Sequence, residues 1–273
     1  MTYPQPGGPG GGKTNAPLIA GVVAVVLIVV ASVLVAVLVP GRGSVDGVAL
    51  AASDGGTTSS KRPTTSRKTT TPPTAGATKS CQYKATPGRP NTKDVGTPTN
   101  PAEVPASGTV TITLATSEGR IPVTLDRGKA ACAVHSMLFL AEKKFFDASR
   151  CHRLTTAATL KVLQCGDPSA TGQGGPGYEY ASEDPTDFKP AGEGVVTYPA
   201  GYVAMANAGP DTNGSQFFLV YGDSTIPPNY PVLGTFDDTG KTTLGQVVAN
   251  GVGDGSQDGE PKKPVTITEV TTG

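Results

Sequence analysis

Residues 205–218, with the sequence MANAGPDTNGSQFF, have the composition of a binding surface rather than of a core element. Small side chains at Ala206 and Ala208 allow a ligand to approach the backbone closely, and Asn213-Gly214 marks a turn. The next segment, 216–220, has the composition of a strand. A surface with free backbone groups, one amide side chain and an aromatic ring suits an extended peptide better than a phosphate.

Four sequence blocks precede this segment. They are FFD at 145–147, HRL at 152–154, QCGDP at 164–168 and TGQGGPGY at 171–178. Together with 205–218, in this order, they resemble the cyclophilin family of peptidyl-prolyl cis/trans isomerases. Thirteen of the fourteen positions in 205–218 agree with the family signature, and Asp211 is the exception. The resemblance covers residues 105–273, which is the size of one domain.

The reaction that the resemblance implies needs neither a cofactor nor a proton transfer. An X-Pro bond isomerises slowly because its partial double-bond character sets a barrier of about 18 to 20 kcal/mol. Twisting the bond makes the imide nitrogen basic, so a fixed cation that donates to it stabilises the transition state. The resemblance implies that Arg153 is this donor and that Gln164 orients it. His152 is expected to be a packed side chain rather than a base.

The resemblance also implies a peptide groove. The backbone of Asn207 would hold the residue before proline, and Phe218 would form the floor of the proline pocket. Its neighbour Phe217 is expected to point into the core, because adjacent strand residues face opposite sides. The expected substrate-binding residues are Ala206, Asn207, Gln216, Phe218, Leu160, Val162, Ile226 and Tyr230.

Some positions depart from the family pattern. Lys161 and Val162 stand where many members carry an aromatic residue and a methionine, and the preceding loop, 155–160, is longer than usual. Leu160 would supply the missing apolar contact if the longer loop shifts the register. The departures leave a second hypothesis, a non-catalytic proline-peptide binding or scaffold module at the cell surface. Retention of Arg153 favours an enzyme, because a binding module does not need it.

The elements that must position these residues are mostly β. Residues 110–115 and 121–125 alternate as strands around a turn, and 265–268 has strand composition. Only 134–144 has strong helical periodicity. The resemblance implies an eight-stranded antiparallel barrel capped by two helices.

The first 104 residues are organised differently. After a short tail, 1–16, residues 17–39 carry no charge and are long enough to cross a bilayer as a helix. The run is longer than a secretory signal, so we predict an uncleaved single-pass anchor. Residues 40–104, rich in Thr, Pro, Gly and Ser, are predicted to be a disordered stalk. The domain follows at 105–273.

Charge separates these two parts of the chain. Residues 1–104 hold ten Lys and Arg and four Asp and Glu, whereas 105–273 hold twelve and eighteen. An acidic domain argues against nucleic-acid binding. The basic stalk is expected to be a solvated linker, and weak contact with anionic headgroups or wall polymers is the alternative. The expected partners are proline-containing polypeptides, and the domain is expected to be monomeric.

All four cysteines, Cys81, Cys132, Cys151 and Cys165, follow the predicted anchor. Their even number predicts up to two disulfides and an extracytoplasmic domain at the cell membrane. No metal site is expected, since no Cys-x-x-Cys pair and only two histidines are present. Three connectivities are possible. Strand parity disfavours Cys151 with Cys165 unless a bulge intervenes, because Arg153 and Gln164 would face one side together.

Overall fold

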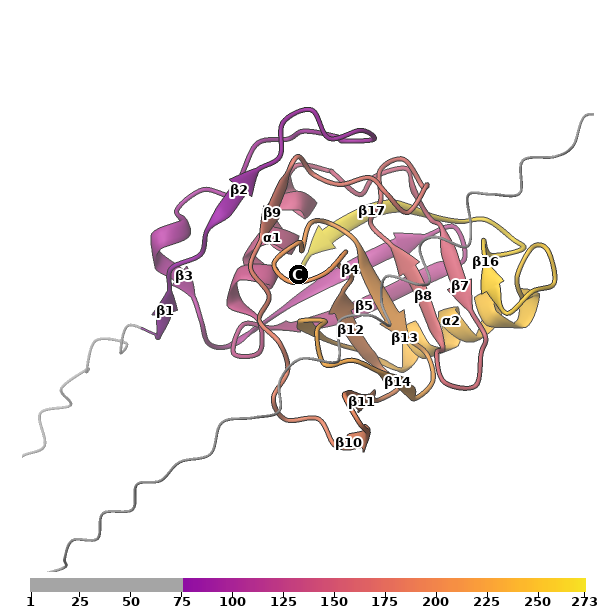
Figure 1. Ribbon diagram of the computed structural model, residues 1–273. Coiled ribbons are helices and arrows are strands. Elements are labelled where there is room, and N and C mark those ends of the chain that lie inside the picture. Colours follow the sequence, from indigo (N-terminus) through magenta and orange to yellow (C-terminus); the bar gives the residue numbers. More distant parts are fainter. Residues whose placement is uncertain (1–75) are drawn as a thin grey trace, which may run out of the picture. The chain divides into compact units, whose positions relative to one another are not determined.

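The computed structural model describes residues 76–273, and their main element is a ten-stranded antiparallel sheet (Figure 1). Its strands, in order across the sheet, are β16 (Asp258–Gly259), β7 (Arg153–Thr155), β8 (Val162–Cys165), β13 (Phe217–Val220), β12 (Tyr202–Met205), β15 (Val232–Phe236), β5 (Gly119–Asp126), β4 (Thr109–Thr116), β17 (Val265–Thr272) and β6 (Ser149–Cys151). Strands β6 and β7 are separated only by His152, so the sheet curls into a half-barrel.

The strands predicted from alternation are confirmed. Segments 110–115, 121–125 and 265–268 correspond to β4, β5 and β17; β4 and β5 are slightly longer than predicted, and β17 is twice as long. In β5, Ile121, Val123 and Leu125 are buried, while the residues between them are more exposed. This period of two fixes which face of the hairpin covers the core.

Two helices, α1 (Ala131–Glu142) and α2 (Asp238–Asn250), pack against the sheet. The predicted helix at 134–144 is α1, which begins three residues earlier. Its first N–H groups, those of Cys132 and Ala133, donate to Glu183 Oε2 at 2.9 and 3.0 Å, so a distant carboxylate caps it. Asp237 caps α2 by accepting from the Gly240 N–H.

Three smaller sheets accompany the main one among the described residues. They pair β1 (Thr78–Lys79) with β3 (Val104–Pro105), β2 (Tyr83–Ala85) with β9 (Tyr178–Tyr180), and β11 (Val195–Tyr198) with both β10 (Pro190–Gly192) and β14 (Ser224–Ile226). A 3₁₀ turn, η1 (Pro101–Glu103), precedes β3.

Residues 76–104, here named the N-terminal extension, differ from the prediction. They were assigned to the disordered stalk, but they pair with β9, and Cys81 and Val104 are buried at 4% and 2% exposure. The prediction of disorder is wrong for these residues, because a few buried side chains are enough to order a Pro- and Thr-rich segment. The predicted tail, the anchor and the stalk up to residue 75 lie outside the described residues. Within 76–273, no helix has the length and apolar character needed to cross a membrane.

The four cysteines form two disulfides. Cys81 pairs with Cys132, which attaches the N-terminal extension to the first turn of α1, and Cys151 pairs with Cys165. The second disulfide is the one that strand parity disfavours, and it forms because the strand is interrupted at His152, which is the exception that the parity argument allows. The His152 N–H still donates to the Gln164 carbonyl, at 3.1 Å, whereas Cys151 has left this ladder and pairs with β17. The interruption resets the alternation and turns Cys151 toward Cys165.

Candidate active site

The three residues predicted to act on the substrate stand in one row across neighbouring strands. Arg153 of β7 lies directly opposite Gln164 of β8, which lies opposite Phe218 of β13. Residues directly opposite one another in a sheet point to the same face. The register therefore places a guanidinium, an amide and an aromatic ring side by side.

Hydrogen bonds fix this row. Arg153 Nη1 donates to Gln164 Oε1 at 3.3 Å, and Gln164 Nε2 donates to Gln216 Oε1 at 2.9 Å. On its other side, Arg153 forms a bidentate pair with Asp258 of β16, with Nε–Oδ1 and Nη2–Oδ2 distances of 2.7 Å. Such a fork restricts the guanidinium plane. Arg153 is thus held from both sides, with Nη1 toward Gln164.

The pair with Asp258 also determines protonation. The hydrogen bond to Asp258 raises the pKa of Arg153, although its partial burial opposes this. The same bond lowers the pKa of Asp258, although desolvation by burial opposes this. Both groups are ionised at neutral pH with their ordinary pKa values, the pair moves each pKa further from neutrality, and Arg153 is a permanent donor beside the pocket.

A cavity of about 160 Å³ opens beside this row. It is lined by Arg153, Leu160, Val162, Gln164, Ala206, Asn207, Phe218, Ile226 and Tyr230. These are all of the predicted catalytic and substrate-binding residues except Gln216, which contacts Gln164 and lines a neighbouring cavity.

The departures from the family pattern leave an apolar wall on one side of this pocket. Leu160 and Val162 line it, whereas Lys161 between them does not. The Lys161 side chain extends instead over Gly222, where an added Cβ would lie 2.6 Å from Lys161 Cδ. The longer loop thus places Leu160 as the apolar contact that an aromatic residue would otherwise supply.

Phe218 and Phe217 have the opposite orientations predicted. Phe217 is fully buried and packs edge-on against Phe146 at 5.8 Å between centroids. Phe218 packs edge-on against Tyr230 at 5.6 Å and also contacts Tyr198. A flat ring with supported edges is a suitable floor for a proline ring.

The rim of the pocket is organised around Asn207. Its side-chain Nδ2 donates to the Asn229 carbonyl at 2.8 Å and to Asn213 Oδ1 at 3.3 Å, while its Oδ1 accepts from the Gly209 N–H. The Asn207 backbone N–H and carbonyl form no hydrogen bond among residues 76–273. These two groups are available to an extended peptide, as predicted for this position.

Two residues of the site, Asp258 and Tyr198, are not identified by any pattern in the sequence. Asp258 stands in a Gly-, Ser- and Asp-rich loop whose composition gives no functional signal. Tyr198 is fully buried, and its hydroxyl donates to the Tyr230 carbonyl and accepts from the Tyr230 N–H, which fixes the loop bearing Tyr230. Neither contact follows from local pattern, because both depend on residues more than 30 positions apart in the sequence.

The sequence profile described as "Cyclophilin type peptidyl-prolyl cis-trans isomerase/CLD" matches residues 110–272. The chain belongs to the cyclophilin family. Curated cyclophilins similar to it include "Probable peptidyl-prolyl cis-trans isomerase B" of Mycobacterium tuberculosis, 45% identical over 202 residues, covering 70% of this chain and 63% of the relative. The protein of the same name in Mycobacterium leprae is 47% identical over 177 residues, covering 63% and 58%. The matched region thus spans less than two thirds of either relative.

The fold agrees with a solved cyclophilin. A crystal structure of a "cyclophilin type peptidyl-prolyl cis-trans isomerase" from Cryptosporidium parvum aligns with a TM-score of 0.50 at 24% identity. The alignment covers 61% of this chain and 98% of the other. The half-barrel with two helices is therefore the cyclophilin fold.

His152 gives a prediction about stability. Both of its ring nitrogens are buried without a hydrogen-bond partner among the described residues, and burial lowers its pKa. Because the unfolded chain then binds the proton more readily than the folded one, stability should decrease as the pH falls below the ordinary value of 6.5. Urea unfolding at pH 7.5 and 5.5 should show this loss, and His152→Gln should reduce the difference. If the His152→Gln variant loses as much stability between pH 7.5 and 5.5 as the wild type, the loss comes from another group, for instance His135, whose pKa is also lowered by burial.

Proposed function

We propose that this chain catalyses cis/trans isomerisation of X-Pro peptide bonds. The observation that carries the proposal is the row of Arg153, Gln164 and Phe218, which lines a single pocket. The proline ring lies on Phe218, and the guanidinium of Arg153 donates to the imide nitrogen. That nitrogen is a better acceptor in the twisted state than in either planar state, so the donor lowers the barrier.

The test is direct. The purified full-length chain is added to a short X-Pro peptide whose trans form alone is cleaved by a protease, and the rate of cis-to-trans conversion is followed. The proposal expects acceleration proportional to protein concentration. The alternative, a binding module, expects peptide binding without acceleration. Of the two departures that favour the alternative, Val162 lines the pocket as an apolar side chain and Lys161 does not line it. The position of Lys161 outside the pocket supports the enzyme.

Asp258 is expected to be a positioning residue for Arg153. Asp258→Asn keeps the size of the side chain but removes its charge, so it should leave Arg153 less restrained and lower kcat about tenfold. The KM should change less, because Arg153 acts mainly in the transition state. Because Asp258 is exposed to solvent, the Asp258→Asn variant is expected to fold like the wild type. A loss confined to KM, or no loss, would contradict this role.

The same ion pair predicts a flat pH profile. Arg153 lowers the pKa of Asp258 below its ordinary value of 3.8, so Asp258 stays ionised and the activity should be constant from pH 8 to about 5. Activity should fall only as the pH approaches the lowered pKa. A decline centred between pH 6 and 7 would instead indicate that a histidine contributes.

We further propose that the isomerase domain is tethered outside the cytoplasm by a single-pass anchor at 17–39 and acts as a monomer on secreted, membrane or cell-wall proteins. The uncharged run and the two disulfides support this location. Intact spheroplasts treated with protease should lose the domain. Full protection until lysis, with all four thiols labelled without reduction, would overturn it.

A further inference from the structure

A second cavity, of about 120 Å³, lies beside the proline pocket. The two share Gln164, Ala206 and Asn207, so a peptide crossing Asn207 passes from one to the other. One wall of the second cavity comes from outside the segment matched by the cyclophilin profile. It consists of Thr86 and Arg89 of the N-terminal extension.

Backbone contacts hold the N-terminal extension in this wall. The Thr86 N–H donates to the Gly177 carbonyl at 2.8 Å, and the Lys93 N–H donates to the Gly175 carbonyl at 3.1 Å. At Gly174 an added Cβ would lie 2.7 Å from the Asn91 carbonyl oxygen, so the glycine-rich loop and the extension are in close contact. Arg89, between these contacts, is therefore presented by a fixed segment.

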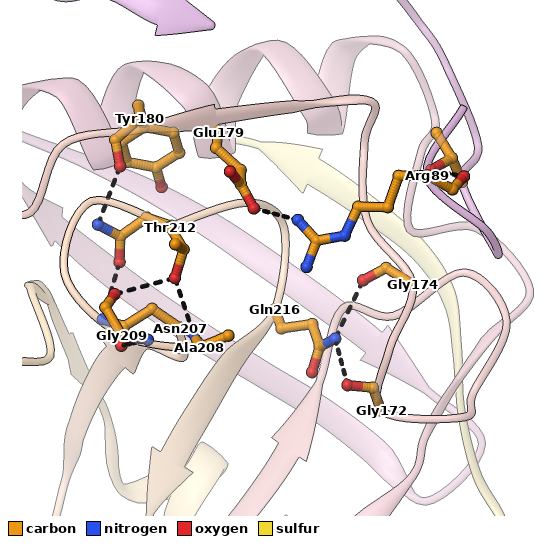
Figure 2. Close-up of polar contacts among 12 residues, drawn as sticks. Arg89, Gly172, Gly174, Glu179, Tyr180, Asn207, Ala208, Gly209, Thr212 and Gln216 are labelled. Atoms are coloured by element: carbon orange, nitrogen blue, oxygen red, sulfur yellow. Dashed lines mark hydrogen bonds and ion pairs between the residues drawn. The ribbon is translucent and has the colours of Figure 1, made fainter. Parts of the chain in front are cut away.

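The polar side chains around this cavity differ in how many of their hydrogen-bonding groups have a partner. Gln216 Nε2 donates to the carbonyls of Gly172 and Gly174, each at 3.0 Å, and its Oε1 accepts from Gln164. Arg89 donates through Nη1 to Glu179, and its other two guanidinium nitrogens have no partner among residues 76–273. Figure 2 shows the guanidinium between Glu179 and the Gln216–Gly174 contact. Arg89 thus offers unused donors at the cavity.

We propose that Arg89 of the N-terminal extension gives this cavity a preference for a carboxylate side chain located one or two residues before the X-Pro pair. The inference rests on the proposed function, because it needs a peptide whose proline lies over Phe218. Upstream residues then follow from Asn207 toward Arg89. The N-terminal extension, outside the matched segment, would set the sequence preference of the enzyme.

Glu179 limits the preference of the cavity for a carboxylate side chain. Its carboxylate competes for Arg89 and repels an incoming carboxylate, and Arg89 is 39% exposed, so the gain is moderate. We expect a Glu peptide to be preferred over its Ala counterpart about fivefold in kcat/KM, because exposed charge pairs contribute about 0.2 to 1 kcal/mol. The preference should fall at 0.5 M salt, because the Debye length shortens.

The experiment measures both rate and binding for the full-length chain. Peptides with Glu, Gln, Ala or Lys at each of the two positions before X-Pro are compared in the isomerisation assay and in NMR titrations. Arg89→Ala should bring the Glu to Ala ratio to about one. Glu179→Gln should raise the ratio above the wild-type value, because it removes the competing carboxylate. Lys79→Ala removes a similar ion pair of the extension, that with Glu183, whose two residues line neither cavity, and should keep the wild-type ratio.

Opposite shifts in the two cavity variants are the decisive result, since general damage would move both ratios in one direction. Equal affinities of the wild type for the Glu and Ala peptides, or a preference that survives in Arg89→Ala, overturn the subsite. Failure of the proposed function is distinguishable, because a chain that accelerates no peptide would still show the charge preference in the titrations.

Discussion

Arg153→Ala is expected to lower kcat/KM for X-Pro isomerisation about 100-fold to 1,000-fold without unfolding the domain. Removing one fixed donor to a developing acceptor typically costs about 2.7 to 4 kcal/mol of transition-state stabilisation. Folding should survive, because the partner left behind, Asp258, has a side chain 54% exposed to solvent. The measurement is the protease-coupled rate together with a thermal unfolding curve of the same sample.

A matched control is available on β6, the strand that precedes β7 along the chain. Arg150 is an exposed arginine of β6 that does not line the proline pocket, so Arg150→Ala should retain the wild-type rate. Arg153→Lys keeps the charge but loses the planar fork that binds Asp258, and an intermediate rate is expected. Equal rates for the wild type and Arg153→Ala would show that the guanidinium does not act on the imide bond.

The site was predictable from the sequence to the extent that it depends on register. Arg153, Gln164 and Phe218 belong to motifs of fixed spacing, and the sheet places them in one row. Leu160 was predicted only conditionally, because a loop length alone does not say which residue faces the pocket. The contact of Arg153 with Asp258, 105 residues away, depends on how a Gly-rich loop folds back, and no local pattern encodes this.

Two departures from the predicted structure have a common physical cause. The parity rule for Cys151 and Cys165 holds for a continuous strand, and the interruption at His152 is its exception. The stalk was extended to residue 104 because composition averages over a segment, whereas a few buried side chains and one disulfide decide whether it is ordered. Long-range contacts of single residues thus override both strand alternation and composition.

Removing the Cys81–Cys132 disulfide should produce the second large effect, on stability. The bond closes a loop with a sequence separation of 51, for which chain entropy predicts about 4 kcal/mol of stabilisation. Cys151–Cys165 has a separation of only 14 and should contribute about 3 kcal/mol. Urea unfolding of the double variants Cys81→Ala/Cys132→Ala and Cys151→Ala/Cys165→Ala measures both losses, with the larger expected for the first pair.

The two double variants should differ more in which segment unfolds locally than in their total free energy of unfolding. Without Cys81–Cys132, the N-terminal extension is held only by hydrogen bonds, two ion pairs and a few buried contacts, so protease should cleave within 76–104 before the domain unfolds. Arg89 would then leave its cavity, and the charge preference for upstream residues should disappear while the Arg153 row remains. The Cys151–Cys165 variant should keep the extension protected. If both variants are cleaved alike, the disulfide at Cys81 does not hold the extension, and its attachment must come from the pairing of β2 with β9.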